Sequence, residues 1–326
     1  MAKKISIIIV SFNTKHLIDR CFNSVKNSAG ELEYEIIVVD NMSKDGSYDH
    51  IKEKYPEVKL IQSGGNIGFA AANNLGFKSA EGEYIVLLNS DAFIVEDGLK
   101  KSVEKMEKDK RIGLGGVKLI GENGEWQPSA RTFPGIFTEF STISGLSDKY
   151  KNTRIFGKVN MTYCNQEEDI VCDWVPGAFS IIRREVIEKI GLFDERFFLY
   201  FEEVDLCRRI KKAGYKIIYW ADIKVIHIGG GSTTVFSEKL VSKSGMQMTL
   251  WRLQSQYLYY RKNYGICKTL CSKYLEQVWN YIRYKKNIKK NPKKAEESKV
   301  VLELIKKAWI YTKGGEISPE RPWKGE

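Results

Sequence analysis

The sequence of 326 residues lacks a long hydrophobic run and contains only three histidines. Its six cysteines form no paired framework. The longest apolar run near its start, Ile7–Val10, falls far short of the roughly 18 residues that a membrane-spanning helix needs. The run leads into Ser11-Phe12-Asn13 and not into a small-residue cleavage site, so we expect a strand there and no signal peptide. The cysteine usage is typical of a protein in a reducing cytosol.

Several signatures of nucleotide-binding proteins and hydrolases are also missing. The segment Gly64–Phe69 lacks the glycine spacing of a dinucleotide-binding fingerprint and follows the third predicted strand. No Walker A, HExxH or GxSxG sequence occurs in the chain. These absences argue against an NAD enzyme, a P-loop NTPase and a serine hydrolase.

Positive charge is plentiful but unevenly placed. Residues 261–326 hold 17 Lys and Arg against 7 acidic residues, whereas residues 1–260 hold 35 against 34. The chain is therefore an almost neutral body with a basic tail, and such tails bind anionic surfaces such as lipid headgroups or nucleic acid. With 43% hydrophobic residues, the body can bury a sizeable core.

Short Ile- and Val-rich runs alternate with helix-like stretches through the first 120 residues. The predicted strands are Ile5–Val10, Glu35–Asp40, Val58–Gln62, Tyr84–Asn89 and Leu114–Ile120, and the predicted helices are His16–Asn27, Tyr48–Lys54, Ala70–Ser79 and Gly98–Lys108. This rhythm predicts an α/β fold with a mainly parallel sheet that has helices on both faces.

After residue 120 the pattern changes. Residues 121–172 show no sustained period, and we expect them to form a long excursion over one edge of the sheet. The elements predicted next are the strand Trp174–Ile182, the helices Arg183–Ile190 and Glu202–Ala213, and the two strands Lys216–Trp220 and Lys224–His227. From about Glu238 the chain reads as helical, with Pro292 and Gly314-Gly315 as the main interruptions.

Polar side chains follow three of the predicted strands. Ser11-Phe12-Asn13 ends the first, Asp40-Asn41 the second and Asn89-Ser90-Asp91 the fourth. Such residues often cap helices or shape turns. However, ligands bind at the carboxyl ends of strands in open α/β sheets, and three polar strand ends at one edge favour a phosphate-bearing ligand.

These blocks resemble a family 2 glycosyltransferase of the rhamnosyltransferase-like branch. The resemblance rests on Ile7–Asn13, Val38–Asn41, Asn66–Ala70 with Asn73-Asn74, Leu87–Asp91, Trp174–Ala178, Phe193–Glu195, Phe201–Leu206 and His227 with Gly229-Gly230. It covers roughly residues 4–235 and implies a GT-A fold over 1–236. The nucleotide-sugar half would span about 1–120 and the acceptor half about 121–236, followed by a helical basic extension, 237–326.

The resemblance implies roles at the donor site. Asp40 would accept a hydrogen bond from N3–H of a uracil or thymine base, and Asn13 would frame the nucleoside. Asp91 matches the last Asp of a metal-binding DxD motif, which reads Asn89-Ser90-Asp91 here and so keeps a single carboxylate. The implied donor-binding residues are Ser11, Asn13, Asp40, Asn66, Phe69, Asn73, Asn89, Ser90 and Asp91.

His227 is a second candidate metal ligand. A lone His after an apolar strand is commonly a packed or capped residue, but this one precedes Gly229-Gly230-Gly231, where main-chain N–H groups could approach phosphate. In the family the matching His helps to hold the metal or the diphosphate. We therefore expect Asp91 and His227 to hold Mg²⁺ or Mn²⁺ with the donor.

Glu203 is the predicted catalytic base. Acidic residues in the first turn of a helix are often mere dipole partners, but inverting transfer needs a carboxylate to take the proton of the acceptor hydroxyl. The family pattern is usually Glu-Asp at this place, so Glu203 is one methylene longer than the matching Asp. The acceptor-binding residues implied beside it are Trp174, Gly177, Arg131 and Glu202.

The predicted activity is inverting transfer of rhamnose from dTDP-rhamnose, or of another sugar from a UDP-sugar, to a lipid-linked or growing surface glycan. A nucleotidyltransferase acting on sugar phosphates is an alternative, although that class usually carries a glycine-rich basic loop where this chain has Ser11–Lys15. A nucleic-acid-binding protein that uses the basic tail is a weaker alternative, and we expect no nucleic-acid partner.

The tail has two interpretations that can coexist. Ile266, Leu270, Tyr274 and Val278 recur at four-residue spacing and could settle, with the surrounding lysines, at an anionic membrane surface. They could equally pack back on the body and leave the lysines in solvent. The first interpretation predicts a cytoplasmic protein that is peripheral on the inner face of the cell membrane.

Overall fold

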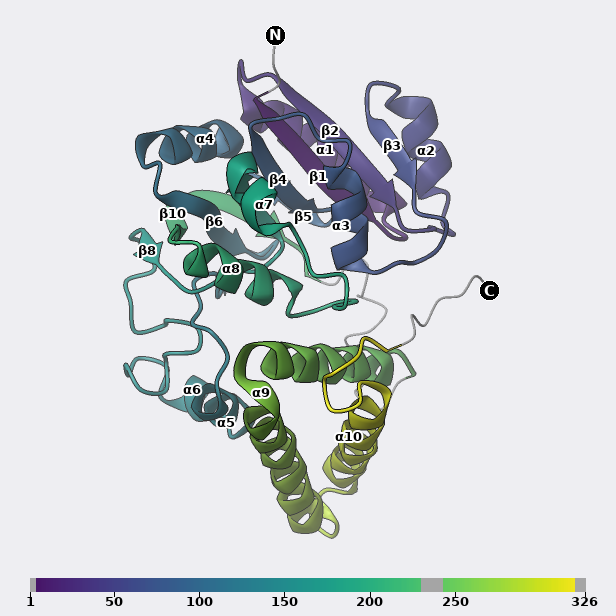
Figure 1. Ribbon diagram of the computed structural model, residues 1–326, viewed down its shortest axis with the longest axis vertical. Helices are drawn as coiled ribbons and strands as arrows, with labels where there is room; N and C mark the ends of the chain where they lie inside the picture. The colour runs from purple at the N-terminus through teal and green to yellow at the C-terminus, as the bar shows by residue number, and fades with distance from the viewer. Residues whose placement is uncertain (1–3, 230–242, 320–326) are drawn as a thin grey trace.

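A ten-stranded sheet forms the body of the protein in the computed structural model, which describes residues 4–229 and 243–319 (Figure 1). Its strands are β1 (Ile5–Ser11), β2 (Tyr34–Asp40), β3 (Lys59–Gln62), β4 (Tyr84–Asn89), β5 (Ala92–Ile94), β6 (Ile112–Ile120), β7 (Trp126–Gln127), β8 (Ile170–Val171), β9 (Phe179–Arg183) and β10 (Lys216–His227). The strand order is β3-β2-β1-β4-β9-β6-β10-β5, while β7 pairs with β6 and β8 pairs with β10.

The strands β1, β2 and β4 run parallel, as their continuous apolar sequences predict. β1 pairs in parallel with β2 and β4, β2 with β3, and β6 with β10, whereas β9 and β5 are antiparallel to their neighbours. Because β1, β2 and β4 point the same way, their polar carboxyl ends meet at one edge. The predicted α/β class is confirmed.

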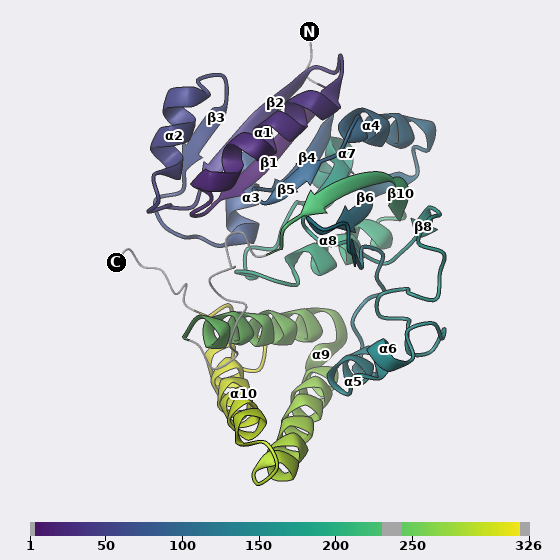
Figure 2. The ribbon, with the colours of Figure 1, turned by 180° about the vertical axis from the view of Figure 1, so that it is seen from behind.

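Helices cover both faces of the sheet (Figures 1 and 2). The helices are α1 (Lys15–Ala29), α2 (Ser47–Lys54), α3 (Phe69–Phe77), α4 (Gly98–Lys108), α5 (Ile136–Ile143), α6 (Leu146–Lys149), α7 (Arg184–Ile190), α8 (Glu202–Lys212), α9 (Lys243–Asn287) and α10 (Pro292–Tyr311). One core joins the sheet to α1, α2 and α4 through residues such as Ile18, Ile51 and Val103. The other joins it to α3, α7 and α8 through residues such as Ala70, Ile187 and Ile210.

Three predicted strands differ from the structure. The strand expected at Trp174–Ile182 begins only at Phe179, because Pro176 and Gly177 interrupt it, and Trp174 makes a single bridge to Arg131. The two strands expected at Lys216–Trp220 and Lys224–His227 are one strand, β10, with a register shift between Trp220 and Lys224. The short irregular stretch between them is therefore a bulge.

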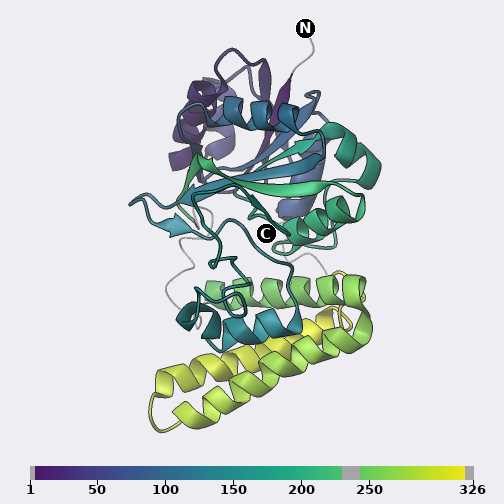
Figure 3. The same ribbon diagram turned by 90° about the vertical axis from the view of Figure 1, so that its left-hand side faces the viewer.

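Residues 121–172 carry β7, α5, α6 and β8. This region extends from the sheet toward the C-terminal helices, where α5 packs beside α9 (Figure 3). The expected excursion is thus present, and it links the body to the extension.

α9 consists of two arms that meet at Gly265, whose φ of 80° and ψ of 178° break the helix. The first arm, 243–264, lies under the sheet layers, and the second, 266–287, leads away from them to a hairpin with α10 (Figures 1 and 3). None of the helices in the described ranges is both long enough and apolar enough to span a membrane. The predicted domain boundary at 236/237 and the glycines Gly230 and Gly231 fall outside the described residues.

The amphipathic stripe in the second arm points outward. Ile266, Tyr274 and Val278 are exposed, so the interpretation that these side chains pack on the body is wrong for them. Polar residues of this arm, such as Ser272 and Glu276, are buried instead.

Candidate active site

A cavity of about 410 Å³ opens at the carboxyl ends of β1 and β4. It brings together Val10, Phe12, Asn41, Asn66, Gly68, Phe69, Asn89, Ser90, Asp91, Pro176, Gly177, Ala178, Phe198, Leu199, Tyr200, Glu202, Glu203, His227, Met248 and Trp251. The predicted base and both predicted metal ligands therefore line one cavity.

Asp40 lies at the end of β2, beside this cavity but not in its lining. It is fully buried; its Oδ2 accepts a 3.0 Å hydrogen bond from Ser43 N, and its Oδ1 has no hydrogen-bond partner among the described residues. Burial raises the pKa of Asp40, while the hydrogen bonds from Ser43 oppose that shift. A buried oxygen without a partner is the feature expected of a carboxylate that receives a ligand N–H.

Three of the predicted donor residues instead bond within the loops around the site. Ser11 Oγ lies 3.1 Å from Thr14 Oγ1, and Asn13 accepts a 2.7 Å hydrogen bond from Lys44 N. Asn66 lines the cavity, yet its Oδ1 accepts from Asn41 Nδ2 and from Gly68 N. These bonds fix the loops that frame the cavity.

Asn73 is buried on α3, where its Nδ2 donates to Phe69 O and its Oδ1 has no partner among the described residues. Phe69 follows Gly68, where a Cβ atom would lie 2.5 Å from Phe198 O. Glycine is required there because Phe69 N donates a 2.9 Å hydrogen bond to the same carbonyl. This hydrogen bond joins the start of α3 directly to the loop that precedes α8.

Asp91 and His227 lie side by side in the lining of the cavity. His227 Nε2 lies 3.6 Å from Asp91 Oδ1, and His227 Nδ1 lies 3.0 Å from Gln127 Oε1. A donor hydrogen on Nδ1 would leave the Nε2 lone pair directed at Asp91, which is the tautomer of a metal ligand. Burial lowers the pKa of His227, against the nearby Asp91 charge, and this favours the neutral ring.

The set of donors fits a divalent ion only in part. Asn89 Oδ1 is buried without a partner among the described residues beside Asp91 and His227. Yet no three His, Cys, Asp or Glu side chains cluster anywhere in the described ranges. Ligand oxygens would have to complete the coordination sphere of an ion held here.

Glu202 and Glu203 enter the cavity from the start of α8. The two residues before them, Tyr200 and Phe201, adopt left-handed φ values of 70° and 67°. Such backbone strain in bulky residues occurs where a structure must aim side chains at a functional site. The turn therefore directs both carboxyl groups into the cavity.

The two carboxyl groups sit in different environments. Burial and the charge of Glu203 raise the pKa of Glu202 well above its ordinary value. Burial also raises the pKa of Glu203, but main-chain N–H groups and the Arg131 guanidinium oppose the rise. The Arg131 charge and the main-chain N–H groups favour ionisation of Glu203, while the raised pKa of Glu202 favours its neutral form.

Arg131 and Trp174 lie together just behind the cavity. The Arg131 guanidinium is 4.9 Å from the Trp174 ring centroid, and Trp174 Nε1 donates a 2.8 Å hydrogen bond to Thr132 O. Neither side chain lines the cavity itself, whereas Gly177 does, opposite Phe69. The Arg131 charge nevertheless opposes the rise in the pKa of Glu203.

Sequence reasoning missed the contribution of the C-terminal helices. Met248 and Trp251 of α9 line the cavity, and the Trp251 ring is 4.7 Å from that of Phe198. Gln127, which holds His227, was missed as well. No local signal marks these residues, because only the tertiary fold brings them to the site.

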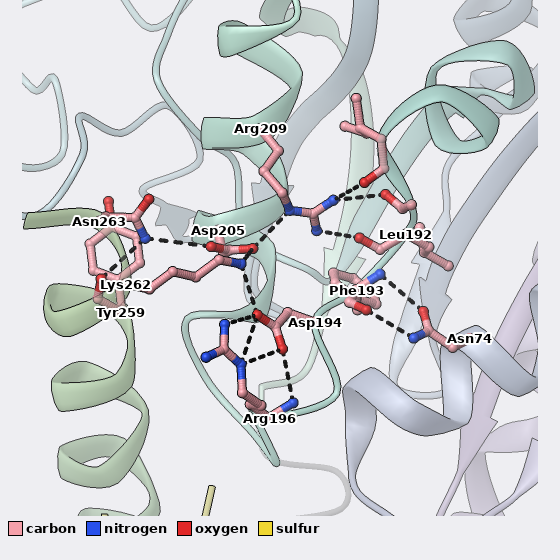
Figure 4. Close-up of polar contacts among 12 residues, drawn as sticks. Asn74, Leu192, Phe193, Asp194, Arg196, Asp205, Arg209, Tyr259, Lys262 and Asn263 are labelled. Carbon is pink, nitrogen blue, oxygen red and sulfur yellow. Dashed lines mark hydrogen bonds and ion pairs between the residues drawn. The ribbon is translucent and has the colours of Figure 1, made fainter. Parts of the chain in front are cut away.

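Ion pairs tie α9 to the loop before α8 (Figure 4). Lys262 Nζ lies 2.8 Å from both Asp194 Oδ2 and Asp205 Oδ2, and Arg209 Nε lies 2.9 Å from Asp205 Oδ2. Asp205 is fully buried. It is therefore a structural anchor of α8 rather than a group that faces the cavity.

The sequence pattern of the family described as Glycosyl transferase family 2 matches residues 6–191. The chain belongs to this family. It is 24% identical over 252 residues to N-acetylglucosaminyl-diphospho-decaprenol L-rhamnosyltransferase of Mycobacterium tuberculosis, covering 72% of this chain and 78% of the relative. It is 27% identical over 266 residues to rhamnosyltransferase WbbL of Escherichia coli, covering 78% of this chain and 91% of the relative.

Solved structures share the fold. Mannosyltransferase PcManGT from Pyrobaculum calidifontis, in complex with GDP-Man and Mn²⁺, matches with a TM-score of 0.54 at 17% identity, over 96% of this chain and 76% of that one. S. aureus TarS 1-349 matches with a TM-score of 0.50 at 16% identity, over 93% and 91%. The predicted family, GT-A type of fold and glycosyltransferase activity are confirmed.

Proposed function

We propose that this glycosyltransferase moves rhamnose from dTDP-rhamnose, or else another sugar from a UDP-sugar, to a lipid-linked or growing surface glycan, with inversion at the anomeric carbon. The observation that carries the proposal is the meeting of Glu203, Asp91 and His227 in one cavity. The similarity to two rhamnosyltransferases, one named for a decaprenol-linked substrate, supports the choice of donor and acceptor.

Glu203 is the base in this proposal. Its carboxylate takes the proton of the acceptor hydroxyl as that oxygen attacks the anomeric carbon, and the bond from this carbon to the diphosphate breaks. The nucleoside diphosphate leaves with the electron pair of that bond. Glu202 and Gly177 line the acceptor side of the cavity. Arg131 and Trp174 support it from outside the lining, with Arg131 favouring the ionised state of Glu203.

At the donor side, Asp40 offers its unpartnered Oδ1 to an N–H of the base. The loops and the start of α3 around the bound nucleoside are shaped by Ser11, Asn13, Asn66, Phe69 and Asn73. Asn89 and Ser90 line the same cavity as Asp91.

Asp91 and His227 would hold Mg²⁺ or Mn²⁺ together with the diphosphate oxygens of the donor. Divalent metal is typical of GT-A enzymes, and when bound it neutralises the charge of the departing diphosphate. Two protein ligands are few for such an ion. Metal affinity should therefore depend on the donor.

The proposal also places the enzyme on the cytoplasmic face of the cell membrane. A lipid-linked acceptor resides there, and the basic residues of 261–326 would be attracted to anionic headgroups. Nucleic acid is not a partner in this proposal.

Thermal shift with dTDP-, UDP- and GDP-sugars, each with and without Mn²⁺, tests the donor, because a bound ligand stabilises the folded state. We expect the largest stabilisation from a dTDP-sugar with Mn²⁺. The anomeric configuration of the product, read by NMR, tests inversion. A retained configuration, or stabilisation by GDP-sugars alone, would contradict the proposal.

A further inference from the structure

The second arm of α9 presents its polar side inward and its apolar side outward. Its inward residues, Thr269, Ser272, Glu276 and Asn280, are buried, while the outward residues Tyr274, Val278 and Ile282 expose 52%, 56% and 54% of their surface. A helix on the surface of a globular protein normally buries its apolar stripe. This arm is inverted.

Polar contacts with the first arm hold the inverted orientation. Gln256 Nε2 donates a 2.8 Å hydrogen bond to Ser272 Oγ, and Arg252 Nη1 donates a 3.0 Å hydrogen bond to Glu276 Oε1. Rotating the apolar side inward would break this ion pair and bury its charges unpaired, which is strongly destabilising. The apolar stripe is thus fixed on the outside.

A groove runs along this outer face between the second arm and α10. Its walls are Tyr274, Gln277, Val278 and Tyr281 on one side and Leu302, Ile305, Trp309 and Ile310 on the other, with Lys273 and Lys306 among them. Lys273 Nζ lies 4.6 Å and 4.7 Å from the ring centroids of Tyr274 and Trp309. A contiguous exposed apolar surface of this kind marks a binding site.

The charge of the hairpin decides what binds there. Residues 266–311 hold 12 Lys and Arg against 4 acidic residues. Two of those four, Glu276 and Glu297, are already paired with Arg252 and Arg283. A second copy docked on the same face would bring like charges together, whereas anionic headgroups complement them.

Tyrosine and tryptophan beside lysine are also the side chains that favour the boundary between headgroups and acyl chains. We propose that the outer face of the α9–α10 hairpin, with Tyr274, Val278 and Tyr281 at its centre, docks on an anionic phospholipid bilayer. This inference specifies the surface that would place the enzyme at the membrane. Its value for catalysis rests on the lipid-linked acceptor of the proposed function. Because α9 also lines the catalytic cavity with Met248 and Trp251, docking would bring that cavity to a lipid-linked acceptor.

The test uses the full chain with phosphatidylcholine vesicles, with and without phosphatidylglycerol. We expect co-sedimentation with the anionic vesicles, weakened by high salt. Val278→Asp should lower the bound-to-free ratio at least about tenfold, because it places a negative charge in the exposed apolar stripe that would enter the anionic bilayer. Val171→Asp is the matched control, since Val171 is 58% exposed on β8 in the body, and it should bind like the unchanged chain.

Thermal unfolding of both variants checks that they fold, and turnover of a water-soluble acceptor should survive in Val278→Asp. No vesicle binding, equal binding to neutral and anionic vesicles, or equal loss in the two variants would overturn the inference. A dimer in sedimentation velocity that Val278→Asp dissociates would identify a second copy as the occupant instead. Vesicle binding as expected with no sugar transfer from any donor would leave the docking face standing and refute the proposed function.

Discussion

Ser255 Oγ donates a 2.8 Å hydrogen bond to the main-chain carbonyl of Leu199. Leu199 precedes the two left-handed residues Tyr200 and Phe201, and the Phe201 ring lies 5.4 Å from that of Tyr259 on the same face of α9. The first arm of α9 therefore supports the strained turn that aims Glu203. The C-terminal extension thus contacts the turn before α8 and lines the cavity through Met248 and Trp251.

Ser255→Ala should lower kcat roughly tenfold with little change in the donor KM, because a slight displacement of the base weakens proton transfer. Steady-state kinetics with varied donor measure this. Ser102→Ala is the matched control, since Ser102 Oγ donates a similar buried hydrogen bond to Gly98 O on α4. If the two variants had equal kinetics, the hydrogen bond of Ser255 would not be needed to support the turn.

Glu203→Gln should reduce turnover at least about a hundredfold, because the amide keeps the size of the side chain but cannot accept the proton. Donor binding, followed by thermal shift, should remain. Glu202→Gln is the comparison: burial and the charge of Glu203 raise the pKa of Glu202 and favour its neutral form, so its amide should cost much less. If Glu202→Gln abolished turnover and Glu203→Gln did not, the roles would be reversed.

Asp91→Ala and His227→Ala should each weaken the Mn²⁺-dependent part of donor stabilisation, because each removes a proposed ligand of the same ion. EDTA should reproduce their effect on the unchanged enzyme. His50→Ala serves as the control, since His50 lies on α2 paired with Asp19. Full activity in EDTA would take the metal out of the mechanism.

Arg131→Met should move the acid limb of the pH profile of kcat/KM to higher pH. Burial raises the pKa of Glu203 and the Arg131 charge opposes that rise, so losing the charge lets the pKa rise further. The base must be ionised to act, and activity then falls at a higher pH as acid is added. Arg131→Lys keeps the charge and should leave the limb near its original position.

The parts of the fold that the sequence predicted are those encoded locally. The runs at Ile5–Val10 and Tyr84–Asn89 are apolar on both faces, which suits only a covered parallel sheet. The polar residues at the ends of these strands, Asp91 among them, then had to share one edge of the sheet. The family motifs placed Glu203 in the same site. Asp40 and Ser11 show what the sequence could not predict, because a motif does not reveal which side-chain oxygen already has a hydrogen-bond partner within the protein.

The C-terminal half of the molecule could not be predicted in the same way. Gly265 reads as one residue in a helical pattern, and nothing local indicates the φ of 80° that turns the helix. The apolar stripe through Tyr274 and Val278 is compatible with a membrane surface or with packing on the body, and the sequence does not decide between them. Its inversion depends on Arg252 and Gln256, which reach the second arm only after the kink forms.

Glu139 gives a prediction for stability against pH. Its carboxyl lies where α5 packs on α9, and burial raises its pKa to about 7, with Glu276 adding to the rise and Tyr260, Ser272 and Arg252 opposing it. The folded state therefore binds a proton that the unfolded chain releases near pH 4.5. The stabilisation is complete below that pH and is lost as the pH rises through about 7.

The unfolding free energy of the unchanged chain should thus fall by at most about 3 kcal/mol from this group between acid and neutral pH. Glu139→Gln cannot lose a proton, so the variant should lack this part of the decline and be the more stable chain above neutrality. Denaturant unfolding across the range measures the difference between the two curves. Glu188→Gln, at a carboxylate 60% exposed on α7, is the control and should follow the unchanged chain. Parallel curves for Glu139→Gln and the unchanged chain would show that the Glu139 carboxyl does not carry its proton into the folded state at neutral pH.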